Sequence, residues 1–180
     1  MMRLTTFLLL AICSTTVAQE PPESTPEAEH QLLAEEVGTW VGTMTMWPAG
    51  ADGPAVEMPM KETVTMIAPG FWTTTKMTAG PFEGRGQNGY DPIKKEYVTT
   101  WIDNSTPHLS VLRGQFDKEK KQMVMFYDGI DIETQKAAKF KAVNEHIAKD
   151  ARRFTMYQQN ATDKSWRKLF VIKTKRESEK

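Results

Sequence analysis

From residue 39 to the C-terminus, the chain consists of short runs of β-branched and aromatic residues that Gly, Pro, Asn and Asp interrupt. This pattern is typical of an all-β sandwich or barrel. We predict about ten strands, at residues 39–47, 58–67, 70–79, 84–90, 96–103, 108–116, 121–128, 136–144, 151–159 and 165–175. Only residues 134–149 also fit a helix. Because the connections are short, the simplest topology is an antiparallel meander whose first and last strands pair to close a barrel.

The first 18 residues have the pattern of a secretory signal peptide. Arg3 gives a positive start, residues 4–12 are mostly apolar, and small residues lead to Ala18. The apolar run is far shorter than the ~20 residues that span a bilayer as a helix, so we predict no membrane span. We expect export to the periplasm or the extracellular space, with a disordered lead at residues 19–26 and one barrel domain at 27–180.

Composition narrows the chemistry of the exported protein. Cys13 is the single cysteine, and its use as a lipoprotein anchor is disfavoured because the bulky Ile12 precedes it. Without the signal peptide, the domain therefore has no disulfide and no thiol nucleophile. The chain has 23 basic and 23 acidic side chains, and removal of Arg3 leaves 22 against 23, a net charge of −1. This balance argues against nucleic acid as a partner.

A short helix is predicted ahead of the first strand. Ser24 and Glu27 have the spacing of a capping box, and Pro26 suits a first helical turn. We predict a helix from Pro26 to Glu36 that ends before Gly38. Because a helix this short is not stable alone, we expect it to pack over one end of the barrel.

Three motifs carry a resemblance to a known family. They are the G-T-W-V-G start at residues 38–42, the glycine-rich segment Gly80–Asp91 and the segment Tyr97–Asp103. Together they resemble the bacterial domain-of-unknown-function 1579 family, which shares a G-T-W-x-G start, a pfeGxgxxGYD segment and a YxxxWiD segment. The resemblance implies an antiparallel lipocalin-like (calycin-type) β-barrel, and the family has no established biochemical activity.

The same resemblance implies a structural role for the G-x-W motif at Gly38 and Trp40. In lipocalins the indole closes the bottom of the barrel, and a basic side chain from near the C-terminus often covers it. Arg176 is the first candidate for this cover and Lys175 the second. A cation over an aromatic face contributes about 0.5–2 kcal/mol, depending on burial.

The central motifs also supply candidate ligand-binding residues. Tyr90, Tyr97, Trp101 and Asp103 offer aromatic faces beside a hydrogen-bonding group, which could orient a ligand in an apolar pocket. The alternative for Asp103 is that it holds the following loop through backbone N–H groups, and for Asp91 we favour a turn-capping role of this kind. Both interpretations of Asp103 stay open at this point.

Enzymatic function is the less favoured interpretation, and we assign no catalytic residue. Residues 103–110 contain a carboxylate, hydroxyls and His108, but adjacency in sequence does not make a nucleophile–base pair. The glycines of the central motif do not have phosphate-loop spacing. The three histidines have no zinc-ligand spacing, no haem motif is evident, and we predict no cofactor.

The methionines allow two interpretations. Met44 and Met46, Met58 and Met60, and Met123 and Met125 are pairs two residues apart, which place both thioethers on one face of a strand. Thioethers could bind a soft ion such as Cu(I), so Met44 and Met46 form a minority copper hypothesis. The favoured interpretation is a deformable apolar core or cavity lining.

The sequence therefore predicts an exported lipocalin-like barrel that binds a small apolar or amphipathic molecule. The chief alternative is a non-catalytic envelope protein-interaction module whose barrel is packed solid. These two classes differ in one observable, because a ligand carrier needs an internal cavity of several hundred Å³.

Overall fold

The computed structural model describes residues 25–48, 53–67 and 70–178. The predicted signal peptide at 1–18, most of the lead at 19–26 and the predicted cap Ser24 lie outside the described residues. Export of the chain therefore stays a prediction.

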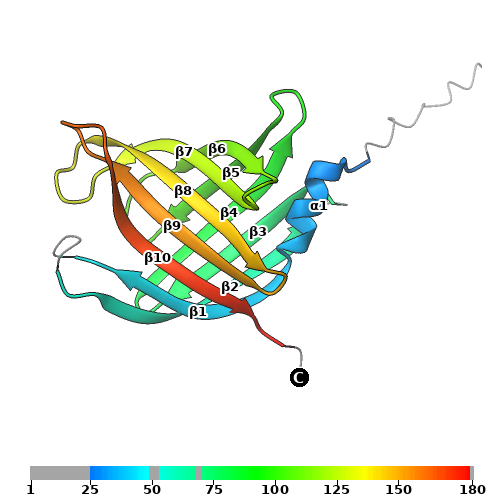
Figure 1. Ribbon diagram of the computed structural model, residues 1–180, viewed down its shortest axis with the longest axis horizontal. Helices are drawn as coiled ribbons and strands as arrows, with labels where there is room; N and C mark the ends of the chain where they lie inside the picture. The colour runs from blue at the N-terminus through cyan, green and yellow to red at the C-terminus, as the bar shows by residue number, and fades with distance from the viewer. Residues whose placement is uncertain (1–24, 49–52, 68–69, 179–180) are drawn as a thin grey trace, which may run out of the picture.

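Ten antiparallel strands form a closed barrel, as predicted from the sequence (Figure 1). In chain order the elements are α1 (Ala28–Glu35), β1 (Gly38–Met46), β2 (Val56–Ile67), β3 (Trp72–Ala79), β4 (Phe82–Asp91), β5 (Glu96–Asp103), β6 (Ser110–Asp117), β7 (Gln122–Ile130), β8 (Ala137–Ala148), β9 (Ala151–Gln159) and β10 (Trp166–Arg176). Each strand pairs with its sequence neighbour, and β1 pairs with β10 to close the sheet.

The first and last strands pair with each other, as predicted. Met44 of β1 is opposite Ile172 of β10, and Met46 is opposite Phe170. The segment at 134–149, which the sequence leaves ambiguous, contains strand β8 rather than a helix. This segment forms a strand rather than a helix because β7 and β9 both pair with it along its length.

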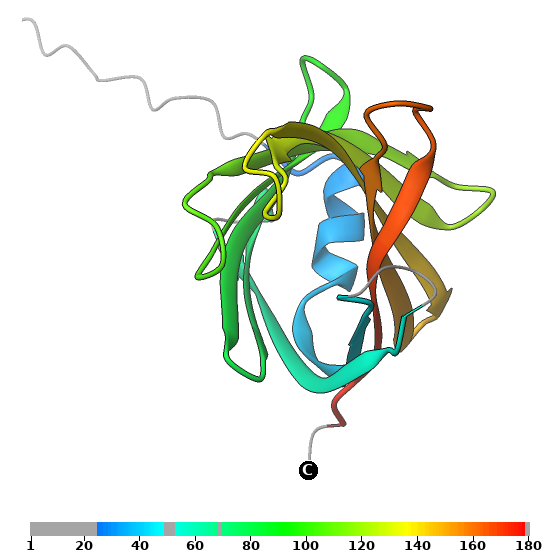
Figure 2. The same cartoon turned by 90° about the vertical axis from the view of Figure 1, so that its left-hand side faces the viewer.

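Helix α1 covers one end of the barrel, which we call the inner end; the opposite end is the mouth. Viewed from the mouth, the helix lies across the far end of the ring of strands (Figure 2). The helix is shorter than predicted because its N-cap is Glu27, whose backbone N–H donates to Nδ1 of His30 over 3.0 Å. Leu33 anchors the helix in the core beside Tyr97, whose hydroxyl donates to the Glu29 carbonyl over 3.0 Å.

Two apolar clusters line the inside of the sheet. The first contains Leu33, Tyr97, Leu112, Met125 and Ala142, and the second contains Met44, Met60, Met77, Ala79 and Ile172. Trp101 and Phe154 pack against both clusters. Apart from Leu33 of α1, these side chains come from every second position along the strands, as the two-residue period of a strand requires.

Candidate functional site

The barrel is hollow, with an interior cavity of about 540 Å³ between the inner end and the mouth. Ligand sites for small molecules typically have volumes of about 300–1,000 Å³. Most of the cavity wall is apolar. It includes six methionines (Met44, Met46, Met77, Met123, Met125 and Met156) and the aromatic residues Phe82, Tyr97, Trp101, Tyr127, Phe140, Phe154 and Phe170. This cavity is the feature that a solidly packed barrel would lack.

Tyr97, Trp101 and Asp103 line this cavity, whereas Tyr90 is not among the described residues of its wall. Tyr90 packs edge-on against His30 of α1, with ring centroids 5.7 Å apart, and against Tyr97 at 5.0 Å. The helix covers this part of β4, so Tyr90 helps to seat α1. The sequence analysis grouped Tyr90 with the cavity residues because it offers an aromatic face near hydrogen-bonding groups, but in the structure His30 of α1 packs against that ring.

Trp101 lies flat against β4 because the opposing strand has glycines there. A Cβ atom at Gly84 would overlap the Trp101 ring, and one at Gly86 would lie 2.9 Å from its Cε3 atom. Real Cβ atoms do not come this close to ring carbons. Gly84 and Gly86 of the central motif therefore leave a surface without side chains on which the indole packs.

Asp103 holds both the indole and the loop that follows it. Its Oδ2 accepts a hydrogen bond from Nε1 of Trp101 over 3.1 Å. Its Oδ1 accepts from the backbone N–H groups of Ser105 and Thr106 over 2.8 and 2.9 Å. Asp91 caps its own turn in the same way, through the backbone N–H groups of Ile93 and Lys94. Asp103 therefore acts on the cavity chiefly by fixing the orientation of Trp101.

The loop that carries His108 does not assemble a nucleophile–base pair in this structure. Nε2 of His108 lies 3.3 Å from the backbone carbonyl of Asp128, at the mouth. In the part of the chain that the structure describes, no three His, Cys, Asp or Glu side chains are grouped to hold a metal ion. The described helix is too short and too polar to span a membrane.

The M-x-M pairs of β1 and β2 meet in the second apolar cluster. Met44 and Met60 are buried there, with Met46 and Met58 packed against them. Their described neighbours in the cluster include Met77, Ala79 and Ile172. The contacts favour a deformable apolar wall, since thioethers fill irregular space well.

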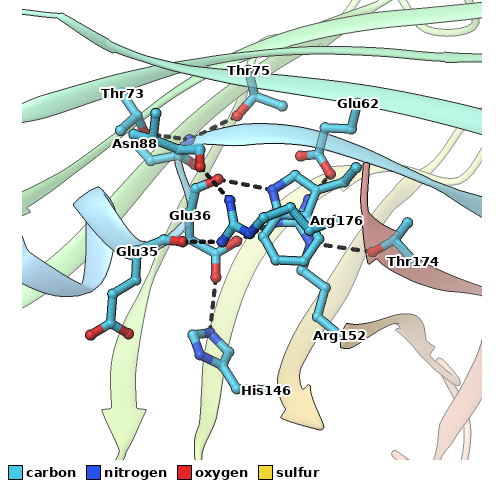
Figure 3. A network of polar contacts seen from close by, with 12 residues as sticks. Glu35, Glu36, Glu62, Thr73, Thr75, Asn88, His146, Arg152, Thr174 and Arg176 are labelled. Atoms are coloured by element: carbon cyan, nitrogen blue, oxygen red, sulfur yellow. Dashed lines mark hydrogen bonds and ion pairs between the residues drawn. The ribbon is translucent and has the colours of Figure 1, made fainter. Parts of the chain in front are cut away.

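A buried ionic network at the inner end is the main feature that the sequence analysis missed. Arg152 of β9 forms ion pairs with Glu36, which follows α1, and with Glu62 of β2 (Figure 3). Its Nε donates to Oγ1 of Thr174 over 3.3 Å. His146 of β8 completes the group, with Nε2 3.1 Å from Oε1 of Glu36. All five side chains also line the inner end of the cavity.

Trp40 lies between two guanidinium groups at this end. The Cζ atom of Arg176 is 4.2 Å from the ring centroid and that of Arg152 is 4.0 Å from it. Arg176, rather than Lys175, therefore covers the indole, and it also donates to the carbonyl of Glu35 over 2.6 Å (Figure 3). Gly38 has a φ of 137°, and a Cβ there would lie 2.6 Å from Arg176. The G-x-W thus fixes the helix, the first strand and the last strand to one another.

The two carboxylates of the network titrate differently. Burial raises the pKa of Glu62, and the nearby Arg152 lowers it less than burial raises it. Burial acts the same way on Glu36, but hydrogen bonds and charge from His146 and Arg152 together hold the pKa of Glu36 below its usual value. The network therefore lowers the pKa of Glu36 and raises that of Glu62, although both carboxyl groups contact Arg152.

Uncharged polar groups extend from this network along the wall. Asn88 donates to Oγ1 of Thr73 and of Thr75 over 3.2 and 3.1 Å, and Thr99 donates to Oδ1 of Asn88 over 2.8 Å. Asn144 of β8 is different. Its Oδ1 is buried and has no hydrogen-bond partner among the described residues.

A sequence signal for these polar groups does exist. Glu62 lies two residues from both Met60 and Val64, and Arg152 lies two residues before Phe154, so both share the inward face of apolar neighbours. Charged residues at inward positions are rare unless they are paired. The alternation therefore marks them as members of an internal network, although it does not give their partners.

A closed antiparallel barrel with a hollow interior and a helix across one end defines the lipocalin-like class. The chain belongs to the family described as "Protein of unknown function (DUF1579)", whose model matches residues 25–176. This confirms the family resemblance of the three motifs.

Two solved structures share the fold at low sequence identity. One is Rv2717c from M. tuberculosis, with a TM-score of 0.57 and 12% identity over 84% of this chain and 99% of that chain. Another is the S-type phycobiliprotein lyase CPES from Guillardia theta, with a TM-score of 0.55 and 10% identity over 86% of this chain and 95% of that chain. Comparison with curated proteins gives no match. At these identities the likeness shows the fold alone.

Proposed function

We propose that this protein binds a small amphipathic molecule inside its barrel. The observation that carries the proposal is the cavity of about 540 Å³, whose wall is mostly apolar and includes methionine and aromatic side chains, with polar groups at both the inner end and the mouth. Burial of apolar ligand surface against this wall contributes about 25 cal/mol per Å². The thioethers adapt to the shape of the ligand, and Trp101, held by Asp103, provides a fixed aromatic surface.

The structural neighbours are compatible with this proposal. One of them is named as a phycobiliprotein lyase. The mixed polar and apolar composition of this chain's own cavity wall supports an amphipathic ligand.

Binding of the uncharged hydrophobic dye Nile red tests the proposal. We expect saturable binding of one dye molecule per barrel, measured as a rise in dye fluorescence. A ligand at a hundredfold excess over its Kd stabilises the folded state by about 2.7 kcal/mol. For a protein of this size this raises Tm by about 5–10 °C.

Two alanines of β8 provide a matched pair of variants. Ala142 is buried and lines the cavity, so Ala142→Phe places a ring in the ligand space. Ala137 is exposed on the same strand, so Ala137→Phe makes the same chemical change on the outside. We expect Ala142→Phe to weaken dye binding at least tenfold and Ala137→Phe to leave it unchanged. Equal dye binding by both folded variants would contradict an internal site.

A further inference from the structure

The mouth of the cavity carries two cationic residues of β10, Arg167 and Lys168. Their strand begins at Trp166 and runs to Arg176 at the inner end, so both cations lie at the end of the barrel opposite α1. Arg167 is half-buried, whereas Lys168 is exposed, with Nζ 5.7 Å from the ring centroid of Trp47. The mouth therefore places positive charge next to an apolar cavity wall.

A β-bulge in β10 determines which way Arg167 points. Between Lys168 and Phe170 the strand advances by two residues while its partner β9 advances by one, so Leu169 is an extra residue. A bulge of this kind re-aims the side chains that precede it. Phe170 packs in the second apolar cluster, and an unbroken alternation from Phe170 would have pointed Arg167 to the outside.

The shifted register instead directs Arg167 into the barrel. Arg167 is opposite Gln158 of β9, which lies two residues from the inward-facing Met156 and lines the cavity with it. The neighbouring Trp166 points outward, where its ring centroid lies 5.9 Å from that of the half-exposed Phe126. The bulge thus exchanges an aromatic ring for a guanidinium on the inner face of the mouth.

The charge of Arg167 has no acidic partner among the described residues. Its Nη2 donates to Oε1 of Gln158 over 3.2 Å, and this neutral acceptor is its one hydrogen-bond partner in the part of the chain that the structure describes. A guanidinium carries five N–H donors in a planar fork that matches a carboxylate or a phosphate. The remaining donors are therefore available to a negatively charged group at the mouth.

Three carboxylates also line the mouth, and two of them are already hydrogen-bonded elsewhere. Asp103 accepts from Trp101 and from the loop that follows it. Asp131 accepts from the backbone N–H groups of its own turn and from Gln158. Glu133, the third, is exposed. The acceptors of the mouth are thus largely satisfied within the protein, while the donors of its guanidinium are not.

The inner end offers the opposite situation. Nε of Arg152 donates to Oγ1 of Thr174. The two terminal nitrogens of its guanidinium pair with Glu36 and Glu62. An anion at the inner end would face these two glutamates and find the guanidinium engaged, and burial of an unpaired charge is costly. An acidic ligand group is therefore favoured at the mouth and disfavoured at the inner end.

Building on the proposed function, we propose that the ligand is an amphipathic anion whose carboxylate or phosphate group binds Arg167 at the mouth. The apolar body extends from there toward the inner end, past Phe170 and the other apolar side chains of the wall. Lys168 adds positive charge beside the acidic group. Arg167 thereby selects the head group, while the wall selects for apolar surface.

Four probes with the same ten-carbon chain separate the head-group chemistries. Decanoate, decyl phosphate, 1-decanol and decyltrimethylammonium compete with Nile red for the purified protein, each below the concentration at which it forms micelles. We expect at least one of the two anions to displace the dye at about tenfold lower concentration than decyltrimethylammonium, as a hydrogen bond to a charged group implies. The anion that displaces the dye at the lower concentration identifies the head group as carboxylate or phosphate.

Arg167→Gln tests the residue, and Lys173→Gln is its matched control. Lys173 is exposed on the same strand and lies outside the described cavity wall, so its substitution removes the same charge from the outer face. We expect Arg167→Gln to weaken displacement by the preferred anion about tenfold and displacement by 1-decanol less than about twofold. Lys173→Gln should leave both unchanged. Arg167→Lys keeps the charge without the planar fork, so it should retain part of the preference for the anion.

The outcomes separate this inference from the proposed function. Equal displacement by the anions and by decyltrimethylammonium, or equal effects of Arg167→Gln and Lys173→Gln, would overturn the inference and leave the ligand-binding function standing. A parallel loss of anion and 1-decanol displacement in Arg167→Gln would also overturn it, because Arg167 would then support the barrel rather than the head group. Absence of Nile red binding to the wild type would overturn both.

Discussion

Arg152 connects several parts of the inner end. It pairs with Glu36 beside the helix and with Glu62 on β2, and its guanidinium lies over Trp40. Its side chain is only 8% exposed. Removal of one partner of a buried ion pair is strongly destabilising, because the remaining charge stays buried without compensation.

We therefore predict that Arg152→Met lowers the free energy of unfolding by about 3–5 kcal/mol. Urea denaturation measures this change. Arg153→Met is the matched control on the same strand, because Arg153 is 43% exposed on its side chain and pairs only with Glu145 among the described residues. Exposed pairs contribute about 0–1 kcal/mol. Equal losses in the two variants would contradict the central role of Arg152.

At the level of the element, β4 works as a platform for an aromatic ring. Gly84 and Gly86 leave a side-chain-free surface on which Trp101 lies, and Asp103 fixes the far edge of the indole. Because Trp101 packs against both apolar clusters, its position couples the two halves of the wall.

Substitution of one glycine should displace the indole. Gly84→Ala puts a methyl group into the space of the Trp101 ring, and we expect a loss of about 1–3 kcal/mol in stability together with a changed near-ultraviolet circular dichroism spectrum. The same substitution in a Trp101→Leu background should cost much less, because the clash is gone. A full cost in both backgrounds would show that the strand itself, rather than the indole, requires glycine.

The sequence was informative about elements and less so about side-chain partners. The alternation of apolar residues and the turn signals were enough for ten strands and for the β1–β10 seam, because a strand's period and its turns are local properties. The positions of Tyr90 and Arg152 depend on α1, which folds back over residues far away in the chain. Partners brought together by such packing are not local properties, so the ionic network was missed.

For the whole molecule, the carboxyl groups make the free energy of unfolding depend on pH. Among the described residues, the folded state lowers the pKa of six carboxyl groups: Glu36, Glu83, Asp117, Asp131, Glu145 and Asp163. The causes are arginine partners for Glu83 and Glu145, His146 and then Arg152 for Glu36, and mainly hydrogen bonds from the turns for the aspartates. Glu62 is the opposite case, since burial raises its pKa.

A group with a lowered folded-state pKa stabilises above its unfolded pKa and loses this contribution as the pH falls through its folded pKa. Glu62 contributes in the reverse direction, because its stabilising effect is present below its unfolded pKa and is lost as the pH rises through its folded pKa. We therefore predict that the free energy of unfolding falls as the pH is lowered from about 5 toward 2. Urea midpoints across this range measure it.

One variant tests whether carboxyl groups with lowered pKa values cause the loss of stability in acid. Asp131→Asn keeps an acceptor for the backbone N–H groups of Glu133 and Thr134 but cannot titrate. It should therefore show a shallower decline in acid than the wild type. A stability that is constant from about pH 5 to pH 3 would contradict the assignment.

The arginine–tryptophan–arginine stack closes the floor of the barrel and ties both chain ends of the sheet to the helix. Under the proposed function, a ligand would enter and leave through the mouth, because α1 lies across the opposite end. Its rate of release would then depend on movements of the hairpins at the mouth, and substitutions in those hairpins would change this rate without altering the inner end.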